Sequence, residues 1–129
     1  MIYIVDTHAL VFFITESERL GKQAAKILRD PKKTLVIPSI VLAEIKYLAA
    51  KKRIAVSLDE ILQYLRTDPR CTVYSLDLDV VLRMPIFNDI HDGIICGTAL
   101  VYEDDIGEKT TIITKDQSIR GRKDVKSIW

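Results

Sequence analysis

Four acidic residues occupy positions where an isolated carboxylate is costly: Asp6, Glu44, Asp92 and Asp116. Asp6 and Asp116 follow apolar, β-branched runs, whereas Glu44 interrupts an apolar helix face and Asp92 opens one. A carboxylate near a core is usually paired with a cation or bound to a metal. A site made only of carboxylates selects Mg²⁺, with Mn²⁺ as the alternative, over zinc. Its natural chemistry is the attack of a metal-activated water on a phosphate ester.

Alternating short strands and longer helices would have to bring these acids together. Strands are predicted at residues 2–6, 34–37, 71–75, 110–114 and 125–128. Helices are predicted at residues 8–15, 17–29, 38–52, 57–66, 77–84 and 90–103, with a polar loop at 104–109. The alternation predicts a single domain over residues 1–129 of the α/β class, with three α/β/α layers and a central, mostly parallel sheet of four to five strands.

The carboxyl ends of the strands are where the four acids are expected to meet. Ligands of an open parallel sheet bind outside these ends, often where the strand order reverses. Asp6 and Asp116 lie at such ends. Helices that follow strands begin at the same edge, so Asp92, in a first helical turn, and Glu44, about one turn into its helix, belong there too.

Several neighbours of the acids could support them. The hydroxyls of Thr7 and Thr114 are expected to orient the carboxylates from an outer shell. His8 and His91 flank the acids and are candidates for a general base. The simpler interpretation of each histidine is a helix-start residue with a local hydrogen bond.

Each acid also has a purely structural interpretation. Asp6 and Asp116 could cap helices, Asp92 could face a helix dipole beside Asp89, and Glu44 could pair with a lysine. The coincidence of all four at one edge is what favours a functional site.

Composition places the chain among ordinary globular domains. Of its 129 residues, 48% are hydrophobic and 29% charged, and no apolar run approaches the roughly 20 residues of a membrane span. No basic stretch precedes an apolar one at the N-terminus, so no signal peptide is expected. Cys71 and Cys96 are expected to be buried thiols in a reducing compartment, which predicts a cytoplasmic protein without a membrane partner.

The net charge of +1 does not itself indicate nucleic-acid binding. Basic clusters at residues 51–53, 120–123 and 32–33 are most simply solvated surface, but they would matter if they bordered the acidic site, since phosphate backbones need a positive rim. No glycine-rich loop follows the first strand, which excludes nucleotide hydrolysis of the P-loop kind.

Four segments resemble, in order, the acidic motifs of the PIN-domain ribonucleases: residues 5–10 (VDTHAL), 38–45, 90–95 (IHDGII) and 114–116 (TKD). The short single-domain length resembles the VapC-type toxins of prokaryotic toxin–antitoxin pairs. The resemblance implies a PIN-like fold and an endoribonuclease that uses Mg²⁺ or Mn²⁺ to cut RNA. It also implies a homodimer, and a cognate antitoxin whose peptide reaches into the acidic groove.

Carried over residue by residue, the resemblance assigns metal binding and catalysis to Asp6, Glu44, Asp92 and Asp116, with Thr7 in support. Two features depart from the family pattern. Position 93 is Gly where many relatives have Arg, and the segment 103–109 is longer and more acidic than the usual connection.

Two other classes remain open on the sequence. One is a non-catalytic module of the same fold that binds RNA or a protein. The other is a metal-dependent phosphatase or receiver domain. A phosphatase would need a second Asp at position 8, which is His, and Asp77 poorly fits the acceptor of a receiver.

A continuous apolar run at residues 10–14 predicts a contact with a partner. A helix that is apolar all round must be covered on more than one side. Part of this run, or of the helix around residues 61–65, is therefore expected in a dimer or antitoxin interface.

Overall fold

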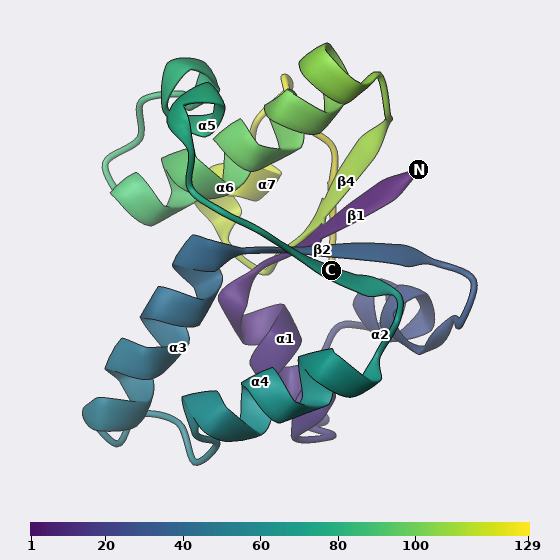
Figure 1. The fold of residues 1–129 in the computed structure, drawn as a ribbon, viewed down its shortest axis with the longest axis vertical. Helices are drawn as coiled ribbons and strands as arrows, with labels where there is room; N and C mark the ends of the chain where they lie inside the picture. The colour runs from purple at the N-terminus through teal and green to yellow at the C-terminus, as the bar shows by residue number, and fades with distance from the viewer.

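A five-stranded, fully parallel sheet forms the centre of the computed structural model, which describes all 129 residues. The strands lie in the order β3-β2-β1-β4-β5 (Figure 1). Their bounds are Ile2–Val5 (β1), Thr34–Pro38 (β2), Cys71–Tyr74 (β3), Thr110–Ile113 (β4) and Ser127–Ile128 (β5). Each predicted strand is confirmed to within two residues, and the sheet is parallel throughout.

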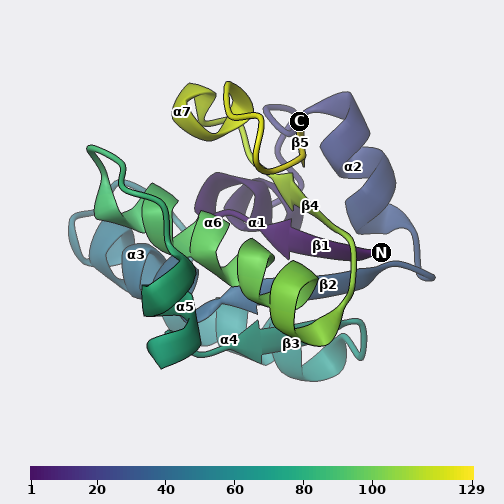
Figure 2. The same cartoon turned by 90° about the horizontal axis from the view of Figure 1, so that it is seen from above.

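Helices cover both faces of this sheet, which confirms the three-layer arrangement (Figures 1 and 2). On one side lie α1 (Thr7–Ile14), α2 (Lys22–Arg29), α3 (Ser39–Ala50) and α4 (Leu58–Thr67). On the other side lie α5 (Leu78–Arg83) and α6 (Ile90–Val101), with α7 (Gln117–Arg120) beside α6 near β5. None of these helices is both long and apolar enough to cross a membrane.

Two segments differ most clearly from the sequence prediction, the start of α2 and the connection that follows α6. Residues 17–20 form a turn closed by the Leu20 N–H on the Ser17 carbonyl, and α2 begins only at Lys22. Later in the chain, α6 ends at Val101 and continues as a wider, π-helical segment, η1 (Tyr102–Ile106). Part of the expected polar loop is therefore helical, and it ends at Gly107, whose φ of 79° lies in the left-handed region that glycine adopts readily.

The connectivity of the sheet creates a crevice beside β1. The chain passes from β1 to β2 and β3 on one side, then crosses to β4 and β5 on the other. Such a reversal leaves a gap outside the carboxyl ends of the two strands that flank it, here β1 and β4. Ile4, Val5, Ile112 and Ile113 are fully buried, so the two strands that end at this crevice are anchored in the core.

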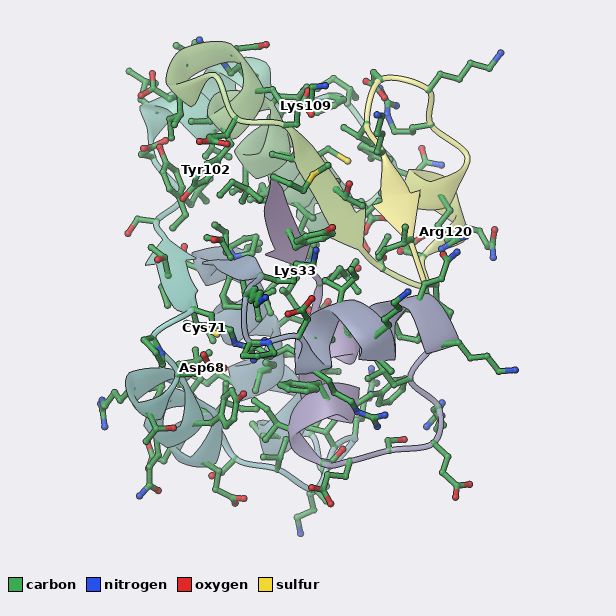
Figure 3. All side chains as sticks on the ribbon, turned by 90° about the vertical axis from the view of Figure 1, so that its right-hand side faces the viewer. Lys33, Asp68, Cys71, Tyr102, Lys109 and Arg120 are labelled. Carbon is green, nitrogen blue, oxygen red and sulfur yellow. The ribbon has the colours of Figure 1, made fainter.

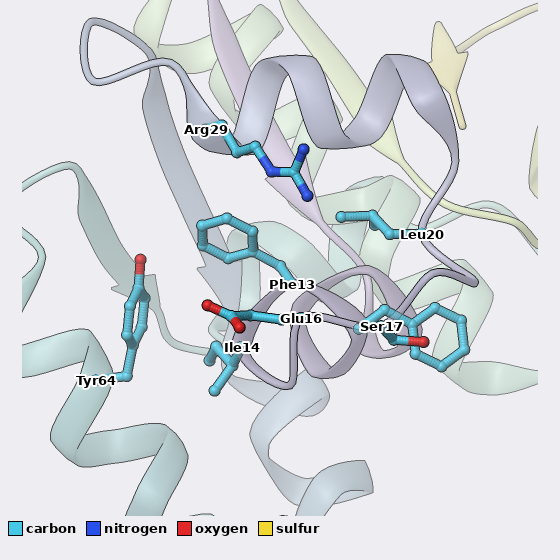
Figure 4. A pocket seen from close by; sticks show the side chains of 8 residues that line it. Phe13, Ile14, Glu16, Ser17, Leu20, Arg29 and Tyr64 are labelled. Carbon is cyan, nitrogen blue, oxygen red and sulfur yellow. The ribbon is translucent and has the colours of Figure 1, made fainter.

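The apolar run on α1 is partly core and partly the wall of a cavity. Leu10, Val11 and Phe12 are buried, but Phe13 and Ile14 remain half-buried. They line a cavity of about 390 Å³ between α1, α2 and α4, which Tyr64 closes from α4 by an edge-on contact with Phe13 (Figure 4). We call this space the α1–α4 cavity. The apolar run on α1 and the helix around residues 61–65, both predicted to contact a partner, therefore line the same cavity.

Arg70 ties the end of α2 to the start of β3. Its guanidinium donates to the Leu28 and Asp30 carbonyls at 2.9 and 2.8 Å and to the Asp68 carboxylate at 2.8 and 3.0 Å. Figure 3 shows Asp68 and Cys71 together at this end of β3. Cys71 is only half-buried here, which corrects its expected place in the core; Cys96 is fully buried.

Replacing Arg70 with Ala is expected to lower the free energy of unfolding by about 2 kcal/mol, because it leaves a nearly buried carboxylate and two carbonyls without their hydrogen-bond donor. Tyr64→Phe, which removes one hydrogen bond to Asp68, should cost about 1 kcal/mol. The Arg70 hydrogen bonds lower the pKa of Asp68, so this stabilisation is present above about pH 4 and is lost as the pH falls. Urea unfolding at pH 7 measures the free energy of unfolding of both variants. Equal losses of stability in the two variants would contradict the larger effect expected for Arg70→Ala.

Candidate metal site

The four predicted acids line one cavity at the carboxyl edge of the sheet. Asp6 follows β1 and Asp116 follows β4, and the Asp6 N–H joins the two strand ends by donating to the Ile113 carbonyl at 3.1 Å. Glu44 comes from α3 and Asp92 from the first turn of α6. The cavity measures about 270 Å³, and we call it the acidic cavity. Its lining residues are Asp6, His8, Glu44, Asp89, His91, Asp92, Ile95, Lys115 and Asp116.

Asp6 is held firmly by its neighbours. Its Oδ1 accepts from the Thr7 N–H at 2.6 Å as the cap of α1, and its Oδ2 accepts from the Thr114 hydroxyl at 2.5 Å. The Thr114 oxygen also accepts from the Asp116 N–H at 3.0 Å, so one buried hydroxyl links both strand-end acids. Thr7 thus contacts Asp6 through its backbone. The capping interpretation of Asp6 is correct, and each carboxylate oxygen retains a further lone pair.

Ser118 joins the other two aspartates, and sequence reasoning missed it. Its hydroxyl lies 2.7 Å from Asp92 Oδ2 and 2.6 Å from Asp116 Oδ1, while its N–H donates to Asp116 as the cap of α7. A hydroxyl has one proton, so it can serve both carboxylates best when one of them is protonated. The pattern of Asp116 followed two residues later by Ser118 is typical of a cap and could have identified this contact.

No cation in the chain neutralises the four acids. None of them takes part in any ion pair of the structure, so the lysine partner considered for Glu44 is not found. Burial raises the pKa of Asp6, and the charges of Glu44 and Asp116 raise it further. Burial also raises the pKa of Asp92 to about 6, with a contribution from Asp116. Such uncompensated, crowded carboxylates favour the arrival of an external cation.

The donor set fits a hard divalent cation. Four carboxylates supply only oxygen atoms, the ligands that Mg²⁺ and Mn²⁺ prefer. As the side chains stand, no three acidic, histidine or cysteine groups are close enough together to hold an ion. The carboxylates would therefore have to move closer together when an ion binds. Burial acts to raise the pKa of Asp116, but the hydrogen bonds from Ser118 and the contact with Asp92 together lower it below its ordinary value.

Two histidines and a lysine surround the acids. Burial and the charge of Lys115 lower the pKa of His8, which keeps its ring neutral at pH 7. The His91 ring lies 3.0 Å from the Asp89 carboxylate, the local hydrogen bond that its helix-start position suggested. Lys115 is exposed, and its ammonium lies 5.5 Å from the Phe12 ring centroid, so it remains available to an anion at the cavity.

Close packing accounts for Gly93, the departure next to Asp92. A Cβ at this position would lie 2.7 Å from the Pro85 carbonyl oxygen and 3.1 Å from the Met84 side chain. Gly93→Ala is therefore expected to cost about 1–3 kcal/mol by overpacking. Gly121→Ala, whose Cβ would meet only the Gln117 carbonyl at 3.4 Å, serves as the control and should be neutral. Thermal unfolding measures the Tm of both variants. Equal Tm values for Gly93→Ala and Gly121→Ala would refute the packing explanation.

The chain belongs to the PIN domain family, whose signature matches residues 3–123. Among curated proteins, no relative matches it significantly.

Solved structures share the fold at low sequence identity. A chain of VapBC2 from Rickettsia felis, solved bound to a DNA fragment from its promoter, has 18% identity and a TM-score of 0.66, with 100% of this chain and 99% of that one covered. A chain of VapBC-1 from nontypeable Haemophilus influenzae has 20% identity and a TM-score of 0.63, with 99% and 97% covered. A toxin–antitoxin complex from Klebsiella pneumoniae contributes a third, at 17% identity and a TM-score of 0.60, with 95% and 94% covered.

Proposed function

We propose that the chain is a metal-dependent endoribonuclease, the VapC-type toxin of a toxin–antitoxin pair. The observation that carries this proposal is the acidic cavity: four carboxylates from four separate elements line one space at the reversal of strand order, and none of them forms an ion pair within the chain. Membership of the PIN domain family supports nuclease chemistry. The similarity to chains of VapBC complexes supports the toxin role.

The roles of the residues follow from their positions. Asp6, Glu44, Asp92 and Asp116 would hold Mg²⁺, or Mn²⁺ in its place. Such an ion, when bound, supplies a nucleophilic hydroxide at neutral pH and charge stabilisation at the phosphate. Thr114 fixes Asp6, and Ser118 fixes Asp92 and Asp116, so these hydroxyls limit how far the carboxylates can turn.

The substrate's phosphate needs a positive contact within this acidic surrounding. Lys115 is the cationic side chain of the acidic cavity, and it follows the strand end between Thr114 and Asp116. We assign it to the phosphate backbone of RNA beside the cleaved bond.

Partners follow from the same proposal. We propose that a cognate antitoxin holds the toxin inactive in the cytoplasm and that the active form is a homodimer. The α1–α4 cavity, with half-buried Phe13 and Ile14 and with Arg29 and Glu16 at its polar rim, suits an amphipathic segment of the antitoxin (Figure 4). In this proposal the partner contact would lie on α1 and α4, the two elements that the sequence singled out.

Cleavage of a panel of structured RNAs by the purified chain tests the activity. Cutting is expected with Mg²⁺ or Mn²⁺ and not with EDTA, and excess metal should restore it. Water attack leaves no 2′,3′-cyclic phosphate, whereas attack by the substrate's own 2′-hydroxyl would leave one. Cutting that persists in EDTA, or products with cyclic ends, would refute the proposal. RNA binding without turnover would indicate a binding module.

A further inference from the structure

A second cavity adjoins the acidic cavity along α3. It measures about 380 Å³ and shares Glu44, Asp89 and His91 with the acidic cavity. Its remaining walls include Tyr47 and Leu48 on α3, and Arg53 just beyond the end of that helix. Because three residues line both spaces, the two cavities lie next to each other on the surface. We call it the Tyr47 groove.

One face of α3 connects the two cavities. Glu44, Tyr47 and Leu48 are spaced three and four residues apart, which puts them on the same side of the helix. The C-terminus of α3 closes with the Lys52 N–H on the Ala49 carbonyl and the Arg53 N–H on the Leu48 carbonyl. Lys52 itself takes a left-handed φ of 57°. This reversal turns the chain back, so that Arg53 faces the helix it has just left.

The charge changes sign along this face. Glu44 marks the acidic end, and the basic cluster Lys51, Lys52 and Arg53 marks the other, about 10 Å further along the axis. That span corresponds to a few nucleotides of one strand. All three basic side chains are exposed, and none forms an ion pair within the chain. Their positive charge is therefore free for an external anion.

Tyr47 supplies an aromatic surface between these ends. The residue is 54% exposed although its side chain is large and partly apolar, and it lies between the acidic cavity and the basic cluster. The Lys51 ammonium lies 5.7 Å from its ring centroid. An exposed aromatic ring next to cations is the arrangement that binds single-stranded nucleic acid, because a base stacks on the ring while the cations hold the phosphates.

We propose that the Tyr47 groove binds the unpaired RNA segment adjoining the cleaved bond, with a base stacked on Tyr47 and phosphates on Arg53 and Lys51. The inference rests on the proposed ribonuclease function and deepens it. A base in a duplex is already stacked on its neighbours and cannot lie flat on a protein ring, so the groove selects single-stranded RNA. Tyr47 is then a substrate-positioning residue outside the metal site.

Equilibrium binding in EDTA tests the groove without cleavage. Fluorescence anisotropy would compare the wild type with Tyr47→Ala, Tyr47→Phe and Arg53→Gln on a labelled single-stranded oligoribonucleotide and on a duplex of the same length. Tyr47→Ala should weaken single-strand binding about 10-fold, and Tyr47→Phe, which keeps the ring, should retain it. Arg53→Gln should reduce the slope of log K against log salt by about 0.7. Arg66→Gln, an exposed charge on α4, is the matched control and should change neither.

Two outcomes would overturn the proposal: unchanged single-strand affinity in Tyr47→Ala, or equal losses on the single strand and the duplex. Circular dichroism checks that each variant folds. The proposed function fails separately. Metal-dependent cleavage together with unchanged RNA binding in Tyr47→Ala would refute the role of the groove and support the nuclease function. RNA binding that depends on Tyr47, without any cleavage, would support the groove and refute the nuclease function.

Discussion

Asp6→Asn is expected to lower the rate of metal-dependent RNA cleavage at least about 100-fold, because loss even of groups that only support a metal ligand costs 10–100-fold. The substitution keeps the shape of the side chain and an acceptor for the Thr7 N–H, so the cap of α1 should survive. What it removes is the charge at the end of β1. Asp92→Asn should have an effect of similar size, from a different element of the fold. Single-turnover cleavage in saturating Mg²⁺ measures both.

Asp59→Asn is the matched control for these variants. Asp59 is an exposed aspartate in the first turn of α4, away from the acidic cavity, and its substitution removes the same charge. Its cleavage rate is expected to equal that of the wild type. If Asp6→Asn and Asp92→Asn cut RNA as fast as Asp59→Asn, the acidic cavity is not the catalytic centre.

The same substitution at Asp92 is expected to stabilise the metal-free protein at pH 7 by about 1–2 kcal/mol, which is less than the full pKa shift corresponds to because solvent screens part of the charge. Burial, together with Asp116, raises the pKa of Asp92 to about 6, above its ordinary value of 3.8. The folded chain therefore holds this proton more tightly than the unfolded chain does. Ionising Asp92 costs stability, and the cost grows as the pH rises from about 4 to about 6.

The pH profile identifies this mechanism. In EDTA, wild-type stability should fall between pH 4.5 and 7.5, and the fall should be smaller in Asp92→Asn. Loss of the Asp68–Arg70 contact acts in the opposite direction and only below about pH 4, so it does not mask the effect. Urea unfolding of both proteins at the two pH values measures this difference in stability. A variant that is less stable than the wild type at both would show that the Ser118 hydrogen bond outweighs the burial of the charge.

The strands and the placement of the acids follow from short-range patterns. Asp6 directly follows a four-residue apolar strand, and Glu44 interrupts the face of Val41 and Ile45, both fully buried in the structure. Parallel strands end at one edge, so acids at those ends meet whatever their separation in sequence. The position of Asp92 is likewise predictable, because it begins a helix whose apolar stripe, which continues through Cys96, is buried in the structure.

Features that depend on contacts between distant segments were not predictable. Ser118 reaches Asp92 across 26 residues of sequence, and Gly93 is explained only by the approach of the Pro85 carbonyl. The π-helical turn after Val101 has no periodicity signal in the sequence. Its wider spacing is seen in the Gly107 N–H, which donates to the Tyr102 carbonyl five residues earlier. Turn and cap chemistry around residues 17–21 competed with helix propensity and shortened α2 at its start.

Metal binding by the purified chain tests the central claim most directly. Mn²⁺ would be titrated into metal-free wild type and Asp6→Asn, and the free ion followed by electron paramagnetic resonance. Saturable Mn²⁺ binding is expected in the wild type, with displacement by Mg²⁺ and a higher Tm on binding, and its loss is expected in Asp6→Asn. Absence of binding in the wild type, or equal binding by both proteins, would contradict a metal site at the four carboxylates.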